Sequence, residues 1–480
     1  MFIPQDKFRP ASRPAPETVY EGKPAKGYFA DAWGRFRKNK ASLTAAVIIG
    51  LLLLFALLTP LLSPYAVRFR DSFYRSLPPQ LAAKTTLSGP QAALDYFSSI
   101  GYETGNSAVK AITSRGQSTT TGDFRFTLQV DEYEKVGFQY VDLSEAEFAA
   151  LRAFEQETGQ QICYPIPNNH ATFYLAVSSS ANLWYELADD GPYSTGESAH
   201  HDADGNPIFA PNYLLDAEGN PVYGVKNQTG YRCRVLYEAY YRYKNGFSPR
   251  YLLGTNQHGQ DILTCLASGA RLSFLLALSV SLINLVIGVC YGAVEGFYGG
   301  KLDLFMERIS DTLSAVPFLV VATLFQLHLA AKVGAVPSLL FAFVLTGWIG
   351  IASRVRSQFY RFKGAEYVLA ARTLGAKDGR LIFRHILPNA IGTIITGTVL
   401  LIPGVIFSES MLSYLGIVNF ESANLTSIGT MLSGGRQYLS TAPHILAFPA
   451  LFIALLEISF NLLGNGLRDA FNPALRGTEV

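Results

Sequence analysis

Residues 43–62 read LTAAVIIGLLLLFALLTPLL, an apolar stretch without a single charged residue. A helix of about 20 apolar residues is long enough to cross the hydrocarbon core of a bilayer. The stretch starts later in the chain than the apolar part of a cleavable secretory signal does. We therefore interpret it as an uncleaved transmembrane helix.

Further apolar runs of similar length follow it, and three of them include or approach an acidic residue. They are Leu272–Val294, Ile309–Ala331, Val333–Ser353, Ile386–Phe407 and Ala442–Leu463. Only 16% of the chain is charged, whereas ordinary soluble domains contain about 25% charged residues. So many long runs are difficult to explain as buried helices of a soluble protein. We predict an all-α polytopic membrane protein with six transmembrane helices.

The basic residues that flank these runs predict the orientation of the chain, because short loops rich in Lys and Arg stay in the cytoplasm. Such residues precede the first run, separate the fourth from the fifth and follow the sixth (Arg35, Arg37, Lys38 and Lys40; Arg354, Arg356, Arg361, Lys363, Arg372, Lys377, Arg380 and Arg384; Arg468 and Arg476). We expect a multi-pass protein of the cell (cytoplasmic) membrane with both termini cytoplasmic. The net charge of +2 gives no support for nucleic-acid binding.

The same pattern divides the chain into parts that follow one another in sequence. We predict a cytoplasmic N-terminal segment, a first transmembrane helix, an extracytoplasmic inserted domain, a five-helix core with a cytoplasmic loop at 360–388, and a cytoplasmic tail. Their limits are 1–42, 43–63, 64–260, 261–466 and 467–480.

The inserted segment has the sequence pattern of a folded α+β domain between the first and second transmembrane helices. Ser144 and Glu147 form a capping box, in which each side chain binds the other residue's free backbone N–H, and Gly159 is suited to end that helix. Residues 122–133 and 171–178 have the β-branched and aromatic content of strands.

A short repeat within the insert predicts two tight turns. Residues 202–209 read DADGNPIF, and residues 216–223 read DAEGNPVY. Asp, Gly and Asn adopt the backbone angles that tight turns require. A calcium loop at Asp202 and Asp204 is the alternative, but an EF-hand loop has Gly at its sixth position rather than its fourth. We predict no metal site in the chain.

Two further features of the insert have open alternatives. Cys163 and Cys233 are either free thiols or an extracytoplasmic disulfide. The tyrosines that cluster near the end of the insert form either a docking surface for a protein partner or the outer part of a small core (Tyr237, Tyr240, Tyr241 and Tyr243).

The cytoplasmic loop carries the clearest functional signal. Residues 366–388 read EYVLAARTLGAKDGRLIFRHILP. Good helix formers continue to Leu374, and Gly375 can end this short helix. Pro388 lies just inside the next span, where its missing N–H costs little. The small side chains of Ala370 and Ala371 would let a groove of another protein close tightly around the helix.

This loop resembles the "EAA" loop of ABC importer permeases, with Ala370, Ala371, Gly375, Leu387 and Pro388 in register. Leu369 stands where that loop usually has Glu, and Glu366 lies one turn earlier. The run RHILPN is similar to the oligopeptide/dipeptide/nickel subgroup. Further stretches resemble the same subgroup: Asp31–Lys40, Leu253–Asp261, Glu409–Gly416 and Phe460–Asp469. The insert is much larger than the family norm, so the resemblance does not imply its role.

The resemblance implies a type I ABC importer permease fold and a transport subunit rather than an enzyme, with no catalytic residue. The implied ATPase-coupling residues are Glu366, Leu369, Ala370, Ala371, Gly375, Ala376, Leu387 and Pro388. The implied partners are a homologous second permease, two ABC ATPase subunits that bind ATP and Mg, an extracellular solute-binding protein and the lipid bilayer. The chain needs no cofactor of its own.

The sequence is compatible with ATP binding by separate subunits, because it contains no Gly-x4-Gly-Lys-Ser/Thr phosphate-binding loop. The expected cargo is an oligopeptide or dipeptide. Nickel, glutathione and antimicrobial peptides are alternatives within transport. A membrane-anchored sensor with an external ligand-binding domain is the alternative from another class, although a sensor needs no ATPase-docking helix.

Charged residues within membrane helices are costly and require a reason. Asp311, Glu409 and Glu457 either line the translocation path or form structural pairs near helix ends. Three of the apolar runs contain a proline that is expected to kink or interrupt its helix: Pro317, Pro403 and Pro449.

Overall fold

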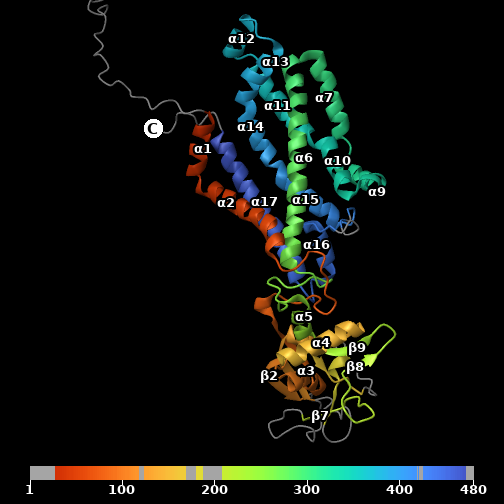
Figure 1. The fold of residues 1–480 in the computed structure, drawn as a ribbon. Helices are drawn as coiled ribbons and strands as arrows, with labels where there is room; N and C mark the ends of the chain where they lie inside the picture. Colours follow the sequence, from red (N-terminus) through yellow and green to blue (C-terminus); the bar gives the residue numbers. More distant parts are fainter. Residues whose placement is uncertain are drawn as a thin grey trace, which may run out of the picture.

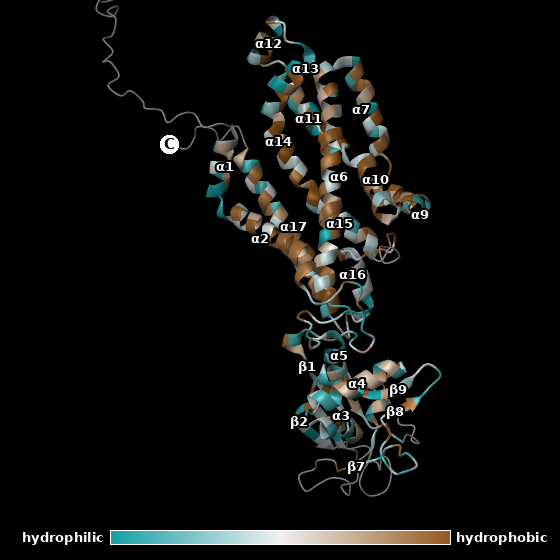
Figure 2. Cartoon of the chain, in the orientation of Figure 1, coloured by the Kyte–Doolittle hydropathy of each residue, from teal (hydrophilic) through white to brown (hydrophobic). Residues whose placement is uncertain are grey.

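The computed structural model describes residues 28–471 except 118–123, 169–179, 188–207, 419 and 421–424. Long helices make up one part of the molecule, and an α/β insert lies beyond one end of them (Figure 1). The long helices are predominantly hydrophobic and the insert is much more hydrophilic (Figure 2). This division agrees with an insert outside the bilayer.

Within the described residues, the helical part contains five helices that are long and apolar enough to cross a membrane. Three are single helices, and two are built from consecutive segments. They are α2 (Lys40–Leu62), α6 (Ile262–Tyr298) and α17 (His444–Ala470), then α10 (Ala335–Gly347) with α11 (Ile349–Phe362), and α13 (Asp378–Arg380), η6 (Leu381–Ile386), α14 (Leu387–Val399) and α15 (Leu401–Tyr414). Shorter elements complete it: α1 (Tyr28–Lys38), α9 (Ala330–Val333), α12 (Glu366–Thr373), α16 (Ile428–Gly435) and η8 (Arg436–Tyr438).

The helix that we expect over residues 309–331 is not continuous. The chain instead forms α7 (Gly300–Ser314) and α8 (Phe318–His328), which meet at an angle of 70°. Pro317 occupies the break and has no N–H to continue the helical hydrogen bonds. If the bent pair counts as one span, the described residues contain six. Pro449, by contrast, lies inside the unbroken α17.

Close approach of α6 and α11 organises the helical core. Gly288, Gly292 and Gly296 recur at every fourth position of α6 and therefore share one face. A Cβ atom at Gly292 would lie 2.2 Å from the carbonyl oxygen of Ala352 on α11. The glycines thus let the two backbones touch, and the apolar side chains beside them fill the surrounding space.

The insert contains a three-stranded antiparallel sheet in the order β1–β3–β2 and a second sheet in which β9 pairs with β4, β5 and β8. Helix α3 (Gln91–Thr104) buries its apolar face against the first sheet, whose strands are β1 (Lys84–Pro90), β2 (Val109–Gln117) and β3 (Phe124–Asp131). The second comprises β4 (Phe138–Leu143), β5 (Cys163–Tyr164), β8 (Gly224–Lys226) and β9 (Tyr231–Leu236). The remaining elements are η2 (Gln80–Ala82), η3 (Glu134–Val136), α4 (Glu145–Thr158), η4 (Ser180–Asn182), β6 (Tyr185–Leu187), β7 (Phe209–Pro211) and α5 (Tyr237–Asn245).

Several local predictions for the insert are confirmed. Ser144 and Glu147 form the capping box of α4, which ends at Gly159 in the left-handed conformation. The side chain of Asp216 accepts hydrogen bonds from the backbone N–H groups of Glu218 and Asn220, as expected for a turn. The strand expected at 171–178, the first copy of the repeat up to residue 207 and the calcium alternative at Asp202 and Asp204 lie outside the described residues.

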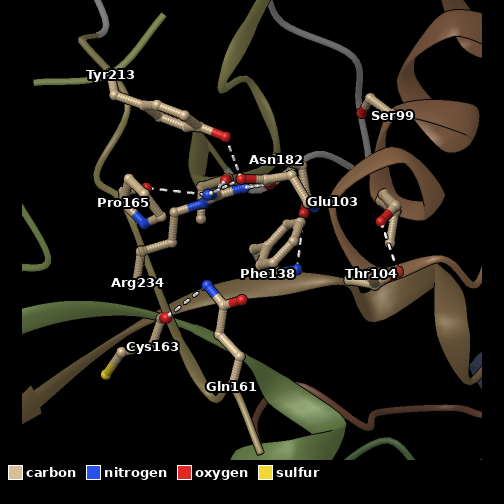
Figure 3. A network of polar contacts seen from close by, with 12 residues as sticks. Ser99, Glu103, Thr104, Phe138, Gln161, Cys163, Pro165, Asn182, Tyr213 and Arg234 are labelled. Atoms are coloured by element: carbon tan, nitrogen blue, oxygen red, sulfur yellow. Dashed lines mark hydrogen bonds and ion pairs between the residues drawn. The ribbon is translucent and has the colours of Figure 1, made fainter. Parts of the chain in front are cut away.

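A buried ion pair connects the two sheets of the insert (Figure 3). The guanidinium of Arg234 on β9 donates to both carboxylate oxygens of Glu103 on α3, at 3.1 and 2.5 Å. It also donates to the carbonyl oxygens of Ala181 and Pro165, and the hydroxyl of Tyr213 donates to Glu103. Burial of this arginine is possible because these acceptors satisfy its N–H groups.

An aromatic neck joins the insert to the membrane helices. It consists of buried tyrosines from the segment after α2, from α5 and from the segment before α6: Tyr65, Tyr74, Tyr237, Tyr241 and Tyr251. Asp71 accepts a hydrogen bond of 2.7 Å from the Tyr237 hydroxyl. Two of the four clustered tyrosines are therefore core residues of this neck, which supports the core alternative over a docking surface.

Candidate functional site

Helix α12 forms a projecting turn at the end of the helical part opposite the insert (Figure 1). It ends as expected, because Leu374 caps it and Gly375 follows with a positive φ of 83°. The backbone N–H of Ala376 then donates to the carbonyl of Ala371, and that of Gly375 to the carbonyl of Arg372. These bonds satisfy carbonyls that a helix end would leave open.

One side of α12 is fixed to the long helices. Val368 is fully buried and packs in a cluster with Phe359, Leu381 and Ile386. Ala371 and Ala376 pack against the same cluster. Their small side chains let α12 lie close to the helices beneath it, so a displacement of α12 would be transmitted to α11 and α14.

The other side of α12 is an open surface with apolar side chains. Leu374 is 88% exposed and Leu369 is 45% exposed. Glu366 and Ala370 are exposed as well. Two exposed leucines on this one short segment make it a candidate surface for a protein partner.

The chain returns into the helical part through a wide helical turn. Residues 381–386 form the π-helical η6, and Pro388 follows at the first turn of α14. Pro388 has no N–H to donate to the carbonyl four residues earlier, which explains why the turn before it widens. The side chain of Asn389 donates to the carbonyl of His385 at 2.7 Å and to the Tyr367 hydroxyl at 3.3 Å. Asn389 therefore connects α12 with α14, a role that the sequence analysis missed.

Comparisons with known proteins support the resemblance of the chain to ABC importer permeases. The family model described as "Binding-protein-dependent transport system inner membrane component" matches residues 285–477, and the "N-terminal TM domain of oligopeptide transport permease C" matches residues 27–79. The oligopeptide transport system permease protein OppC of Bacillus subtilis (strain 168) is 44% identical over 223 residues, which are 46% of this chain and 72% of that protein. The chain belongs to the permease family of binding-protein-dependent transport systems. It is a transport subunit of an ABC importer and not an enzyme.

Other relatives are named for different cargoes. The dipeptide transport system permease protein DppC of B. subtilis (strain 168) is 41% identical over 46% of this chain and 68% of that protein. The glutathione transport system permease protein GsiD of Pectobacterium atrosepticum is 32% identical over 50% of this chain and 78% of that protein. A solved structure, the inward-facing MetNI methionine ABC transporter, matches with a TM-score of 0.36 and 15% identity over 43% of this chain and 96% of that chain.

Family membership decides against the sensor alternative, since members are integral membrane components of transport systems. Residues 80–284, which include most of the insert, lie between the two matched regions. The α12 surface, in contrast, lies within the matched region 285–477.

An ion-pair cluster near α12 anchors α7 to the permease. The guanidinium of Arg356 on α11 donates to both carboxylate oxygens of Asp303 and to both of Glu307 on α7. The Tyr360 hydroxyl donates to Asp303 at 2.6 Å. The spacing of Asp303 and Glu307, four residues apart on one helix face, is the sequence signal that could have indicated this cluster.

The three acidic residues considered for the translocation path occupy different environments. Asp311 is exposed on α7 and pairs with Arg308 at 3.5 Å. Glu409 is buried on α15, where it accepts hydrogen bonds from Ser273 and Ser413. Glu457 on α17 lines an apolar cavity of about 480 Å³ between α15, α16 and α17. In this conformation Asp311 pairs with Arg308, Glu409 is hydrogen-bonded to serines, and Glu457 lines a cavity.

The two cysteines of the insert are neighbours in the same apolar cluster. Cys163 and Cys233 are buried with Leu143 and Val235, and both are free thiols in this structure. Cys163 lies opposite Val235 on β9, two residues beyond Cys233, so both side chains project from the same face of the sheet. The proximity of the Cys233 thiol and burial raise the pKa of Cys163.

Proposed function

We propose that this permease subunit carries oligopeptides or dipeptides across the membrane and is driven by separate ATPase subunits that dock on α12. The observation that carries the proposal is the asymmetry of α12, with Val368 buried in the permease and Leu374 almost fully exposed. Relatives at 44% and 41% identity are named as oligopeptide and dipeptide permeases, which favours a peptide cargo. The glutathione permease is more distant, at 32% identity.

The proposed topology has six spans, with α7 and α8 together as the third. Helix α12 and the insert lie at opposite ends of α6 (Figure 1). If the basic α12 end faces the cytoplasm, both termini are cytoplasmic and residues 64–260 are extracytoplasmic. The permease core then comprises residues 261–466 with the coupling loop at 360–388.

In the proposed docking mode, a groove of the ATPase covers the exposed side of α12. Leu369 occupies the position where related loops usually have Glu, and its exposed apolar side chain is adjacent to the rest of the docking surface. Gly375 and Ala376 lead the chain away from the end of α12, and Leu387 and Pro388 begin α14. We propose that ATP-driven closure of two ATPase subunits, which bind ATP and Mg, displaces α12 and that Val368 transmits this displacement to α11 and α14.

A homologous second permease would complete the pathway, and an extracellular solute-binding protein would deliver the peptide. Asp311, Glu409 and Glu457 are the ionisable residues that we propose for the pathway in at least one of its conformations. The insert would contact the binding protein or the second permease. Deletion of residues 70–245 should then weaken capture of the binding protein, and unchanged capture and uptake would exclude this role for the insert.

Co-purification of the ATPase tests the docking proposal directly. Leu374→Asp adds a charge to an exposed side chain, so the permease should fold normally but lose the ATPase. Leu81→Asp is the matched control, because Leu81 is 97% exposed at the insert end of the molecule. Retention of the ATPase by both variants would refute docking on α12. Uptake of labelled di- and oligopeptides, with nickel and glutathione as competitors, tests the cargo separately.

A further inference from the structure

A cavity of about 480 Å³ lies between α11, α14 and α17. Its lining combines two basic residues, polar groups and apolar walls: Arg354, Thr393, Thr396, Gly397, Leu400, Arg468 and Phe471. Neither the docking surface nor the proposed acidic pathway residues contribute to it. The cavity is therefore separate from the sites described above.

The two arginines of this cavity lack the acids that accompany their neighbour. Arg356, two residues beyond Arg354, binds Asp303 and Glu307. Across the described parts of the chain, neither Arg354 nor Arg468 forms a hydrogen bond or an ion pair. Two unneutralised guanidinium groups that line one cavity favour an anion between them.

A glycine positions one of these guanidinium groups. A Cβ atom at Gly397 would lie 2.2 Å from Nη1 of Arg354, so the guanidinium rests directly on the backbone of α14. Any larger residue at 397 would displace it. Thr393, one turn earlier on α14, adds a hydroxyl that has no hydrogen-bond partner among the described residues.

The position of α1 indicates that the cavity lies near a membrane surface. Helix α1 buries Ala32 and Phe36 but exposes Trp33, Arg37 and Lys38, as an amphipathic helix in the interface does. Gly466 on α17 directly contacts Ser42 and Phe36 at the junction of α1 and α2. Arg468 follows two residues later and is thus at the level of the lipid headgroups.

We propose that this cavity binds the phosphate of an anionic phospholipid, with Arg354 and Arg468 as its ligands and Leu400 and Phe471 beside the start of the acyl chains. Basic pockets between membrane helices bind such headgroups. A free phosphate ion shares the charge but would leave the apolar walls without a partner. The bound lipid would connect α11 and α14 with α17.

Native mass spectrometry of the full-length chain in detergent can test this site with phosphatidylglycerol, phosphatidylcholine and inorganic phosphate as probes. We expect the wild-type chain to retain phosphatidylglycerol in preference to phosphatidylcholine. The double substitution Arg354→Gln and Arg468→Gln should reduce that preference by about fivefold for each arginine removed. Gly397→Leu should have the same effect with both charges present, because it displaces the Arg354 guanidinium.

The double substitution Lys301→Gln and Arg308→Gln is the matched control, since it removes two exposed charges from α7. It should leave the lipid preference unchanged, and far-ultraviolet circular dichroism should show the same helicity in all variants. An equal loss in the control would show that only general surface charge matters and would overturn the proposal. Binding of inorganic phosphate without a preference for phosphatidylglycerol would overturn the assignment to a lipid.

Discussion

The guanidinium of Arg356 on α11 contacts both carboxylate oxygens of Asp303 on α7, at 2.6 and 2.9 Å. This pair joins α11, the segment that leads into α12, to α7, the first helix of the bent pair. Movement of α12 would therefore be shared with α7 as well as with α14.

Asp303→Asn should weaken this joint, because it removes a charge that is mostly buried beside Arg356. Hydrogen bonds that involve charged groups contribute about 1.5–3 kcal/mol, so the melting temperature of the purified permease should fall measurably. Asp311→Asn is the control on the same helix, since its pair with Arg308 is exposed and such pairs contribute about 0–1 kcal/mol. Equal effects of the two substitutions would contradict a special role for Arg356.

Glu103→Gln should destabilise the insert strongly, because it leaves the buried guanidinium of Arg234 without its charge partner. Breaking a buried pair from one side costs about 3–5 kcal/mol. Removing both charges with Glu103→Leu and Arg234→Met should cost less than the single change. Limited proteolysis of the insert measures the difference. A double variant that is less stable than either single variant would contradict the account.

Mild oxidation should join Cys163 and Cys233, because the two buried thiols are neighbours. A disulfide oxidant such as oxidised glutathione would accept the two electrons, and the thiols would release two protons. Intact-mass analysis should show a loss of two hydrogens that reductant reverses, and Cys233→Ser should abolish it. Oxidation that joins Cys265 or Cys290 instead would contradict the proximity seen here.

Alkaline pH should loosen the aromatic neck, because Tyr133 packs against it and its hydroxyl donates to the carbonyl of Tyr251. Burial raises the pKa of Tyr133 to about 12, above the ordinary value near 10. The folded state therefore holds this proton more tightly than the unfolded state, so its contribution to stability is complete below pH 10 and is lost as the pH rises towards 12. Thermal unfolding between pH 9 and 12 should show this loss, and Tyr133→Phe should reduce its slope. An unchanged slope in the variant would exclude Tyr133 as a cause.

The sequence predicted the parts of the fold that depend on local chemistry. The apolar runs gave the long helices, Ser144 and Glu147 gave the start of α4, and Gly375 gave the end of α12. The break at Pro317 was expected from the proline, but the angle of 70° was not, because hydropathy continues through the bend. The two sides of α12 could not be predicted, since only packing shows that Val368 is buried while Leu374 is exposed.

The polar connections between distant segments could not be predicted from one sequence. Arg234 and Glu103 are far apart in the chain, and nothing in either local pattern indicates that they meet. The same holds for Arg354 over Gly397. The spacing of Asp303 and Glu307 indicates an acidic helix face, but it does not identify Arg356 as its partner. These contacts arise only when helices and strands pack, because long-range pairing depends on the whole fold.

A photo-crosslinking amino acid at position 374 offers the most direct test of ATPase docking on α12. In membranes that contain the assembled transporter, we predict a crosslink from position 374 to an ATPase subunit, and none to it from position 81 in the insert. Addition of ATP should change the yield at position 374. If the transporter still takes up its substrate but position 374 forms no crosslink to the ATPase, docking of the ATPase on α12 is contradicted.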